Sequence, residues 1–169
     1  MRRLKAYLEL VRPFTLIAPA VGFVSGSIIA SHGMPDGRVL SGALAALMLN
    51  GASNVNNQCF DLEIDRINKP FRPLPSGKIT RKKAMTFVVC LYIAALALSS
   101  LISPRFLIIA SITAAITFLY SAPPVRLKRY PFASNIATAI PRGMLLIVAG
   151  WSVIKPLSNL EPWFIGFIF

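Results

Sequence analysis

The sequence predicts an all-α protein, a polytopic bundle of helices that crosses a membrane several times. Of its 169 residues, 55% are hydrophobic and only 14% are charged, whereas a soluble domain carries charge at about a quarter of its positions. The apolar residues also fall into blocks, each long enough for an α-helix to cross a hydrocarbon core of roughly 30 Å at about 1.5 Å per residue. Composition and block length together therefore favour membrane helices.

Five apolar blocks and the start of a sixth define the expected spans. The blocks cover approximately residues 14–31, 39–58, 84–102, 105–120 and 135–154, and a sixth begins near residue 162. Pro104 separates the third from the fourth, because proline cannot continue the hydrogen bonding of a helix. Pro141 lies inside the fifth, where neighbouring helices can satisfy the freed carbonyl group. We expect residues 1–169 to be the N-terminal part of a single transmembrane domain that continues beyond Phe169.

The positive charge indicates membrane orientation and argues against nucleic-acid binding. Of the eighteen Lys and Arg residues, fourteen lie before the first span or in the loops after the second and fourth spans, and three lie in the other loops. The positive-inside rule then places the N-terminus and the loops 59–83 and 121–134 in the cytoplasm. A surface that binds nucleic acid would have no reason to follow this alternation. The single His32 and the unpaired Cys59 and Cys90 exclude histidine catalysis and a zinc site.

Amide and carboxylate residues form a stripe along the second span and its cytoplasmic extension. At about 100° per residue they share an arc of roughly 80°; they are Asn50, Asn54, Asn57, Asp61, Asp65 and Asn68. Such residues are costly in a membrane helix unless they face a partner, a cavity or an ion. Asp61 and Asp65 stand one turn apart, which suits Mg²⁺ held by two carboxylates and by substrate phosphates. The alternative is a helix end among the headgroups, with Asp61 paired to a nearby Arg or Lys.

Cations follow the acids in both large cytoplasmic loops. Lys69 and Arg72 come directly after the stripe on a proline-rich segment, and the segment 120–129 adds three cations and two hydroxyl groups. Arg suits bidentate contact with phosphate oxygens, and Lys suits a point-charge contact. A basic loop that only sets topology would look the same, but we expect both loops to converge with the acids on one diphosphate site. Arg142, whose charge is costly inside a span, would line the cavity or neutralise a buried carboxylate.

These motifs resemble the UbiA-type intramembrane prenyltransferase family. The family's first signature, N-x-x-x-D-x-x-x-D, runs here from Asn57 to Asp65, and a family-like segment continues to Gly77. Two further segments are similar to the family, namely Tyr120-Ser121-x-Pro-Pro-x-Arg126-x-Lys128 and Arg12-Pro13 before the first span. The resemblance extends across most of the chain.

The resemblance implies a larger bundle of membrane helices around a central cavity. It implies Mg²⁺-dependent transfer of a polyprenyl group, expected to be geranylgeranyl, from its diphosphate to a lipid or aromatic acceptor within the membrane. Asp61 and Asp65 would bind Mg²⁺ with Asn57 in support. The diphosphate would be held by Arg72, Arg126 and Lys128, and Tyr120 would contact it or the emerging cation. Further candidates are Asn54, Asn68, Lys69, Ser121, Arg142 and Arg12.

The resemblance also leaves one element missing and two other classes of function to weigh. The family's second aspartate motif lies in a later cytoplasmic loop, so we expect this chain to be inactive by itself. A cation transporter or channel could line its path with the polar stripe, but the dense cationic loop would repel metal ions. A phosphatidyl-type transferase requires a D-G-x-x-A-R element that is absent around Asp61.

Aromatic faces can stabilise the allylic cation that forms when the diphosphate leaves. The candidates for this role are Tyr120, Phe60 and Phe118.

Overall fold

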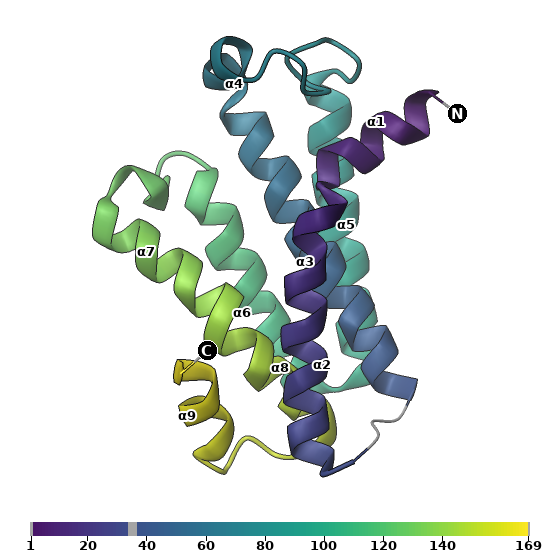
Figure 1. Ribbon diagram of the computed structural model, residues 1–169, viewed down its shortest axis with the longest axis vertical. Coiled ribbons are helices and arrows are strands. Elements are labelled where there is room, and N and C mark those ends of the chain that lie inside the picture. Colours follow the sequence, from purple (N-terminus) through teal and green to yellow (C-terminus); the bar gives the residue numbers. More distant parts are fainter. Residues whose placement is uncertain (1, 34–36, 169) are drawn as a thin grey trace.

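The protein is described by a computed structural model over residues 2–33 and 37–168. All regular secondary structure in these ranges is helical. The helices are α1 (Arg2–Val11), α2 (Ile17–Ser31), α3 (Gly37–Phe60), α4 (Leu62–Asn68), α5 (Arg81–Ile102), α6 (Pro104–Ser121), α7 (Pro131–Ala139), α8 (Leu145–Ile154) and α9 (Glu161–Ile168). Short 3-10 turns are η1 (Pro13–Leu16) and η2 (Leu127–Arg129), and a π turn, η3 (Ile140–Met144), joins α7 to α8. The long helices run side by side along one axis (Figure 1).

Four helical stretches are long and apolar enough to cross a membrane. They are Pro13–Ser31, Arg81–Ile102, Pro104–Ser121 and Pro131–Ile154. These stretches coincide with the predicted first, third, fourth and fifth spans. The predicted second span corresponds to α3, a helix of 24 residues whose C-terminal half is rich in asparagine and largely buried. Because α2, α5, α6 and α8 all pack against α3, its polar side chains face protein, and composition alone does not mark it as a span.

An amphipathic helix, α1, precedes the first span, and the sequence analysis assigned no element to it. Ala6 and Leu10 on one face are buried against a core cluster that includes Val55 of α3 and Val88 of α5. Leu4 and Leu8 face outward. With 10 residues, α1 is too short to cross a bilayer, which is why the search for apolar blocks missed it.

The helices α2 and α8 approach each other so closely that a side chain on either contact glycine would clash. A Cβ atom added to Gly150 would stand 1.9 Å from the carbonyl oxygen of Phe23, and one added to Gly26 would stand 2.2 Å from that of Ile147. The hydroxyl of Ser27 donates a hydrogen bond of 3.0 Å to the Gly150 carbonyl. Small residues and interhelical hydrogen bonds are the usual means of close packing in membranes.

We therefore predict that Gly150→Ala destabilises the bundle by about 1–3 kcal/mol, the range for overpacked cores. The added methyl group meets backbone, which cannot rotate away. Thermal unfolding of the purified protein in detergent measures the effect. Gly33→Ala is the control, since an added Cβ atom there meets nothing within 4 Å. Equal unfolding temperatures for the two variants would contradict the account of α2–α8 packing.

Candidate functional site

The acidic residues lie where α3 ends and α4 begins. Asp61 interrupts the helix with φ −102° and ψ 15°. Even so, its N–H donates to the Asn57 carbonyl at 3.0 Å, and the Asp65 N–H donates to the Asp61 carbonyl at 2.8 Å. The expected continuous helix is therefore divided in two, but Asn57, Asp61 and Asp65 still follow one another turn by turn, as their spacing predicts.

The loop 121–134, between α6 and α7, folds back onto this stripe. Oδ1 of Asp61 accepts hydrogen bonds from Nζ of Lys128 at 2.6 Å and from Nη2 of Arg126 at 3.0 Å. Oδ1 of Asn57 accepts from Lys128 at 2.9 Å and from the hydroxyl of Ser121 at 2.8 Å. The convergence of the loop 121–134 on the stripe is therefore confirmed, and Ser121 belongs to the same cluster.

The loop between α4 and α5 supplies a cation to the second acid. Nη1 of Arg72 donates to Oδ2 of Asp65 at 2.7 Å, and this carboxylate side chain is only 7% exposed. A backbone hydrogen bond of 3.1 Å from Arg72 to the Lys69 carbonyl turns the loop back toward α4. Each of the two acids is thus paired with a cation, as the alternative interpretation of the stripe expected for Asp61. These cations are the same ones that we expect to bind phosphate oxygens.

A polar cavity of about 140 Å³ adjoins Asn57 on the membrane side of the acids. Its lining contains the sequence candidates Arg12, Asn54, Asn57, Tyr120 and Arg142, together with Ser53, Thr117, Ala137, Thr138 and Pro141. Sequence analysis did not single out Thr117 and Thr138. Their positions offered a signal, because Thr117 precedes Tyr120 by three residues and Thr138 precedes Arg142 by four, spacings that share a helix face.

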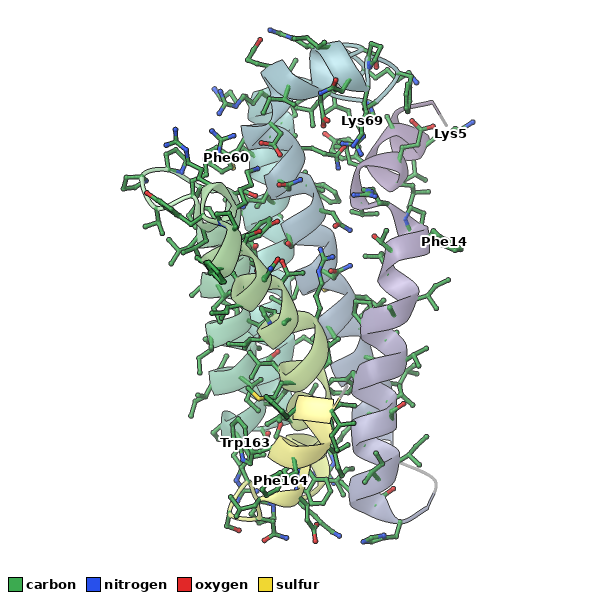
Figure 2. All side chains as sticks on the ribbon, turned by 60° about the vertical axis from the view of Figure 1, so that its left-hand side comes forward. Lys5, Phe14, Phe60, Lys69, Trp163 and Phe164 are labelled. Carbon is green, nitrogen blue, oxygen red and sulfur yellow. The ribbon has the colours of Figure 1, made fainter. Side chains whose placement is uncertain are left out.

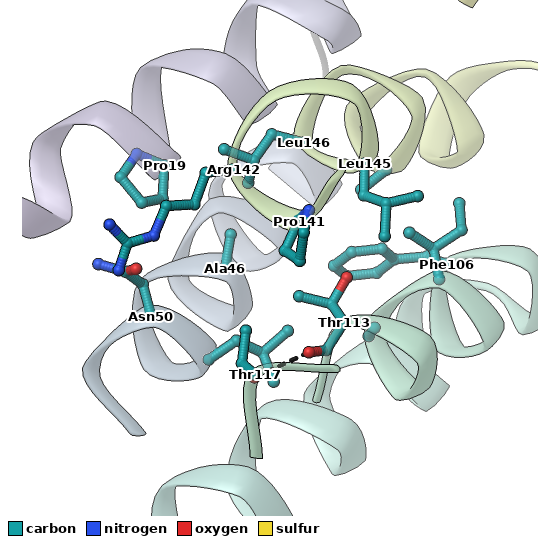
Figure 3. Close-up of a pocket in the computed structure, with 14 residues that line it drawn as sticks. Pro19, Ala46, Asn50, Phe106, Thr113, Thr117, Pro141, Arg142, Leu145 and Leu146 are labelled. Atoms are coloured by element: carbon teal, nitrogen blue, oxygen red, sulfur yellow. Dashed lines mark hydrogen bonds between the residues drawn. The ribbon is translucent and has the colours of Figure 1, made fainter. Parts of the chain in front are cut away.

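Arg142 reaches the cavity from an irregular turn. It lies in the π turn between α7 and α8, where the Leu145 N–H donates to the Ile140 carbonyl. Figure 3 shows its guanidinium group extending toward Asn50 and Pro19. In the described part of the chain it has no hydrogen bond or ion pair. Of the two expectations for Arg142, the structure therefore supports a place on the cavity wall rather than the neutralisation of a carboxylate.

The two asparagines at the inner end of the stripe, Asn50 and Asn54, have hydrogen-bond partners outside the basic loops. Nδ2 of Asn54 donates to the Val11 carbonyl at 2.9 Å and to the Thr15 hydroxyl at 2.8 Å. Nδ2 of Asn50 donates to the Thr15 carbonyl at 3.0 Å. The chain is irregular between α1 and α2, so its carbonyl groups there need side-chain donors.

At the far end of the stripe, Asn68 and Lys69 are exposed, and their side chains have no partner among the residues that the structure describes. Figure 2 shows Lys69 at the outer end of the bundle. The helix interruption at Asp61 and the end of α4 at Asn68 separate these two residues from the buried acids.

Two of the three aromatic candidates also lie outside the described cavities. The Phe60 ring packs beneath the guanidinium group of Arg81 at 5.9 Å, and the Phe118 ring meets Tyr92 edge to face at 6.5 Å. Tyr120 alone among the three lines the polar cavity, and its hydroxyl lies 3.4 Å from that of Ser134.

The buried Asp65–Arg72 pair predicts a large stability effect. Arg72→Gln leaves a buried carboxylate without its charge partner, which costs about 3–5 kcal/mol. Chemical or thermal unfolding in detergent measures the loss, and Asp65→Asn combined with Arg72→Gln is expected to recover most of it. Arg66→Gln is the matched control, because the Arg66–Glu63 pair is 56% and 80% exposed and is worth less than about 1 kcal/mol. Equal losses for Arg66→Gln and Arg72→Gln would show that burial of the pair does not matter.

Three comparisons place this geometry among known proteins. The model of the UbiA prenyltransferase family matches residues 17–169. The digeranylgeranylglyceryl phosphate synthase of Pyrococcus abyssi is 36% identical over 137 residues, which cover 80% of this chain and 48% of that protein. The Methanococcus aeolicus protein of the same name is 35% identical over 169 residues, covering 98% and 57%. The chain thus spans about half the length of the curated relatives it matches.

Solved structures agree with this result. A structure reported for digeranylgeranylglyceryl phosphate synthase in membranes superposes with a TM-score of 0.89 at 36% identity, covering 99% of this chain and 58% of that one. A UbiA homolog from Archaeoglobus fulgidus, bound to GPP and Mg²⁺, superposes with a TM-score of 0.78 at 25% identity, covering 96% and 58%. The chain belongs to the UbiA prenyltransferase family.

Proposed function

We propose that this chain forms the part of a membrane prenyltransferase that binds Mg²⁺ and the diphosphate group of a prenyl donor. The observation that carries the proposal is the cluster in which Asp61 and Asn57 meet Arg126, Lys128 and Ser121 within hydrogen-bond distance. Acids that can hold a hard cation and bases that can hold phosphate oxygens lie together there. The A. fulgidus homolog, bound to GPP and Mg²⁺, supports the same assignment.

The donor set fits Mg²⁺ better than a softer metal. No group of three or more His, Cys, Asp or Glu side chains gathers anywhere in the described ranges, and the carboxylates proposed to hold the ion are those of Asp61 and Asp65. Mg²⁺ is commonly bound by one or two carboxylates, with substrate phosphates and water completing its octahedral shell. When bound, the ion would offset the negative charge that develops on the departing diphosphate.

The cations already stand where they can serve the leaving group. Lys128 and Arg126 donate to Asp61, and Arg72 donates to Asp65. If the carboxylates turned to the metal ion, these donors would become free for the diphosphate oxygens. Lys128 would then contact them as a point charge, and the arginines would contact them through their planar guanidinium groups. Preorganised donors of this kind stabilise developing charge without further reorganisation. Tyr120, at the cavity wall, would face the allylic carbon as positive charge builds there.

The names of the relatives support a finer proposal for the substrates. They are called digeranylgeranylglyceryl phosphate synthases, which supports a geranylgeranyl donor and a glycerol-phosphate lipid acceptor over an aromatic acceptor. We also propose that the end of the bundle with the acids faces the cytoplasm, because most of the Lys and Arg residues lie in the loops at that end.

The proposal predicts that metal and prenyl diphosphate bind cooperatively. Opening the ion pairs of Asp61 for one ligand alone leaves unpaired charge behind, so each ligand assists the other. We expect geranylgeranyl diphosphate to tighten Mg²⁺ binding by at least roughly 5-fold, the lower end of typical couplings. Titration calorimetry on the chain in lipid nanodiscs measures this coupling.

Asp61→Asn is expected to abolish the coupling, and Glu63→Gln, a change of the exposed acid two residues away, is expected to keep it. A cation transporter would bind the metal equally well with and without the diphosphate, and that result would refute the proposal.

The orientation has a separate test. Ser76→Cys and Ser158→Cys place thiols in exposed loops at opposite ends of the bundle, and each is made in a Cys90→Ser background. In intact cells, a membrane-impermeant maleimide should label the Ser158→Cys protein at once, and the Ser76→Cys protein only after permeabilisation. The reverse pattern would overturn the assignment.

A further inference from the structure

An exposed guanidinium group, that of Arg142, lines the polar cavity without a charge partner among the described residues. Arg142 is near the middle of the membrane-length stretch Pro131–Ile154, where a charge is expensive and is normally paired. Its guanidinium group has no hydrogen-bond or ion-pair partner among the described residues, and the same holds for the guanidinium group of Arg12, which lines the same cavity. The lining contains no acid, and Asp61 and Asp65 already bind other cations.

Both arginines stand at irregular points of the backbone. Arg12 adopts φ 57° and ψ 69° in the left-handed region, which costs energy for a residue other than glycine. Arg142 belongs to the π turn η3, a feature that occurs frequently at functional sites. Two separate distortions thus bring two cations to one cavity, and such strain persists only where the surrounding structure enforces it.

The rest of the lining favours an anion. Oδ1 of Asn57 is occupied by Lys128 and Ser121, so its Nδ2 is the group left to donate. The Tyr120 hydroxyl adds a second neutral donor on the wall. At about 140 Å³ the cavity is much larger than the space that one water needs. Arginine side chains form strong, often bidentate hydrogen bonds to phosphate oxygens.

An apolar pocket opens directly beside this cavity. It has a volume of about 40 Å³ and shares Thr117, Pro141 and Arg142 with the polar cavity. Its other walls include Phe106, Ala46 and Leu145, which Figure 3 shows around it. The two spaces together suit an amphiphile whose anionic headgroup contacts the arginines and whose hydrocarbon chain runs along the apolar walls.

We infer that Arg12 and Arg142 form a second anion site, which binds the phosphate monoester of a lipid acceptor. The inference rests on the proposed function and adds the acceptor to it. The diphosphate of the donor has its own cations in Arg72, Arg126 and Lys128. Asn57 borders both sites, because it accepts from Lys128 and also lines the cavity. It therefore places the headgroup of the acceptor next to the donor. Arg142 acts here as a specificity-determining residue for the acceptor.

Binding of two matched lipids tests the inference. The probes are an isoprenyl glycerol ether that carries a phosphate monoester and the same ether with a free hydroxyl group, each titrated into the chain in nanodiscs. We expect the wild-type chain to prefer the phosphate form by roughly ten- to hundredfold, the range for hydrogen bonds to charged groups. Arg142→Gln should remove most of that preference and leave Mg²⁺-dependent binding of geranylgeranyl diphosphate within about twofold, since it keeps every donor of the first site.

Arg142→Lys keeps the charge but loses the planar fork, so an intermediate preference is expected. If Arg142→Gln does not fold, Arg142→Lys takes its place as the test variant. Arg105→Gln removes an exposed arginine at the opposite end of the bundle and should change neither affinity. Equal binding of the two ethers to the wild-type chain would overturn the inference. So would a loss of geranylgeranyl diphosphate affinity in Arg142→Gln, because the cavity would then belong to the donor site. Neither binding measurement depends on turnover. Failure of prenyl transfer would therefore count against the proposed function alone.

Discussion

The ion pairs of Asp61 are the contacts on which the acid-bearing end of the bundle depends. They join the junction of α3 and α4 to a loop 65 and 67 residues further along the chain, and they hold both cations beside Asn57. One and two turns deeper, Gln58 and Asn54 satisfy the carbonyl groups of Leu10 and Val11, just before the junction of α1 and α2. The polar half of α3 thus serves two purposes. It closes the irregular start of the first span and presents acids to the basic loop.

The same pairs account for how one cluster could bind both a metal ion and a diphosphate. Acids and bases in contact leave little uncompensated charge in a partly buried site, where isolated ions are costly. A metal ion and a phosphate group that enter together exchange one set of charge partners for another. A lone metal ion or a lone phosphate would strand charges of one sign. The stability of the ion pairs is thereby linked to the cooperativity of ligand binding.

Much of the fold could be predicted because hydropathy and proline positions are local properties. The spans follow from them, and the acids and bases of the site follow from spacing and charge. The rest depended on tertiary contacts. The short amphipathic helix α1 has no membrane-length apolar block. The helix break at Asp61 has no neighbouring proline or glycine from which it could be predicted. Asn50 and Asn54 serve backbone carbonyl groups that only the folded chain brings near. Phe60 and Phe118 pack against Arg81 and Tyr92, contacts that no spacing in the sequence reveals.

The most direct test of the account is a structure of the protein with Mg²⁺ and a non-reactive thio-analogue of geranylgeranyl diphosphate. The account predicts that Asp61 and Asp65 contact the metal ion. Lys128, Arg126 and Arg72 should have moved from these carboxylates to diphosphate oxygens. A structure in which the Asp61–Lys128 and Asp65–Arg72 pairs stay intact while the diphosphate binds elsewhere would contradict it.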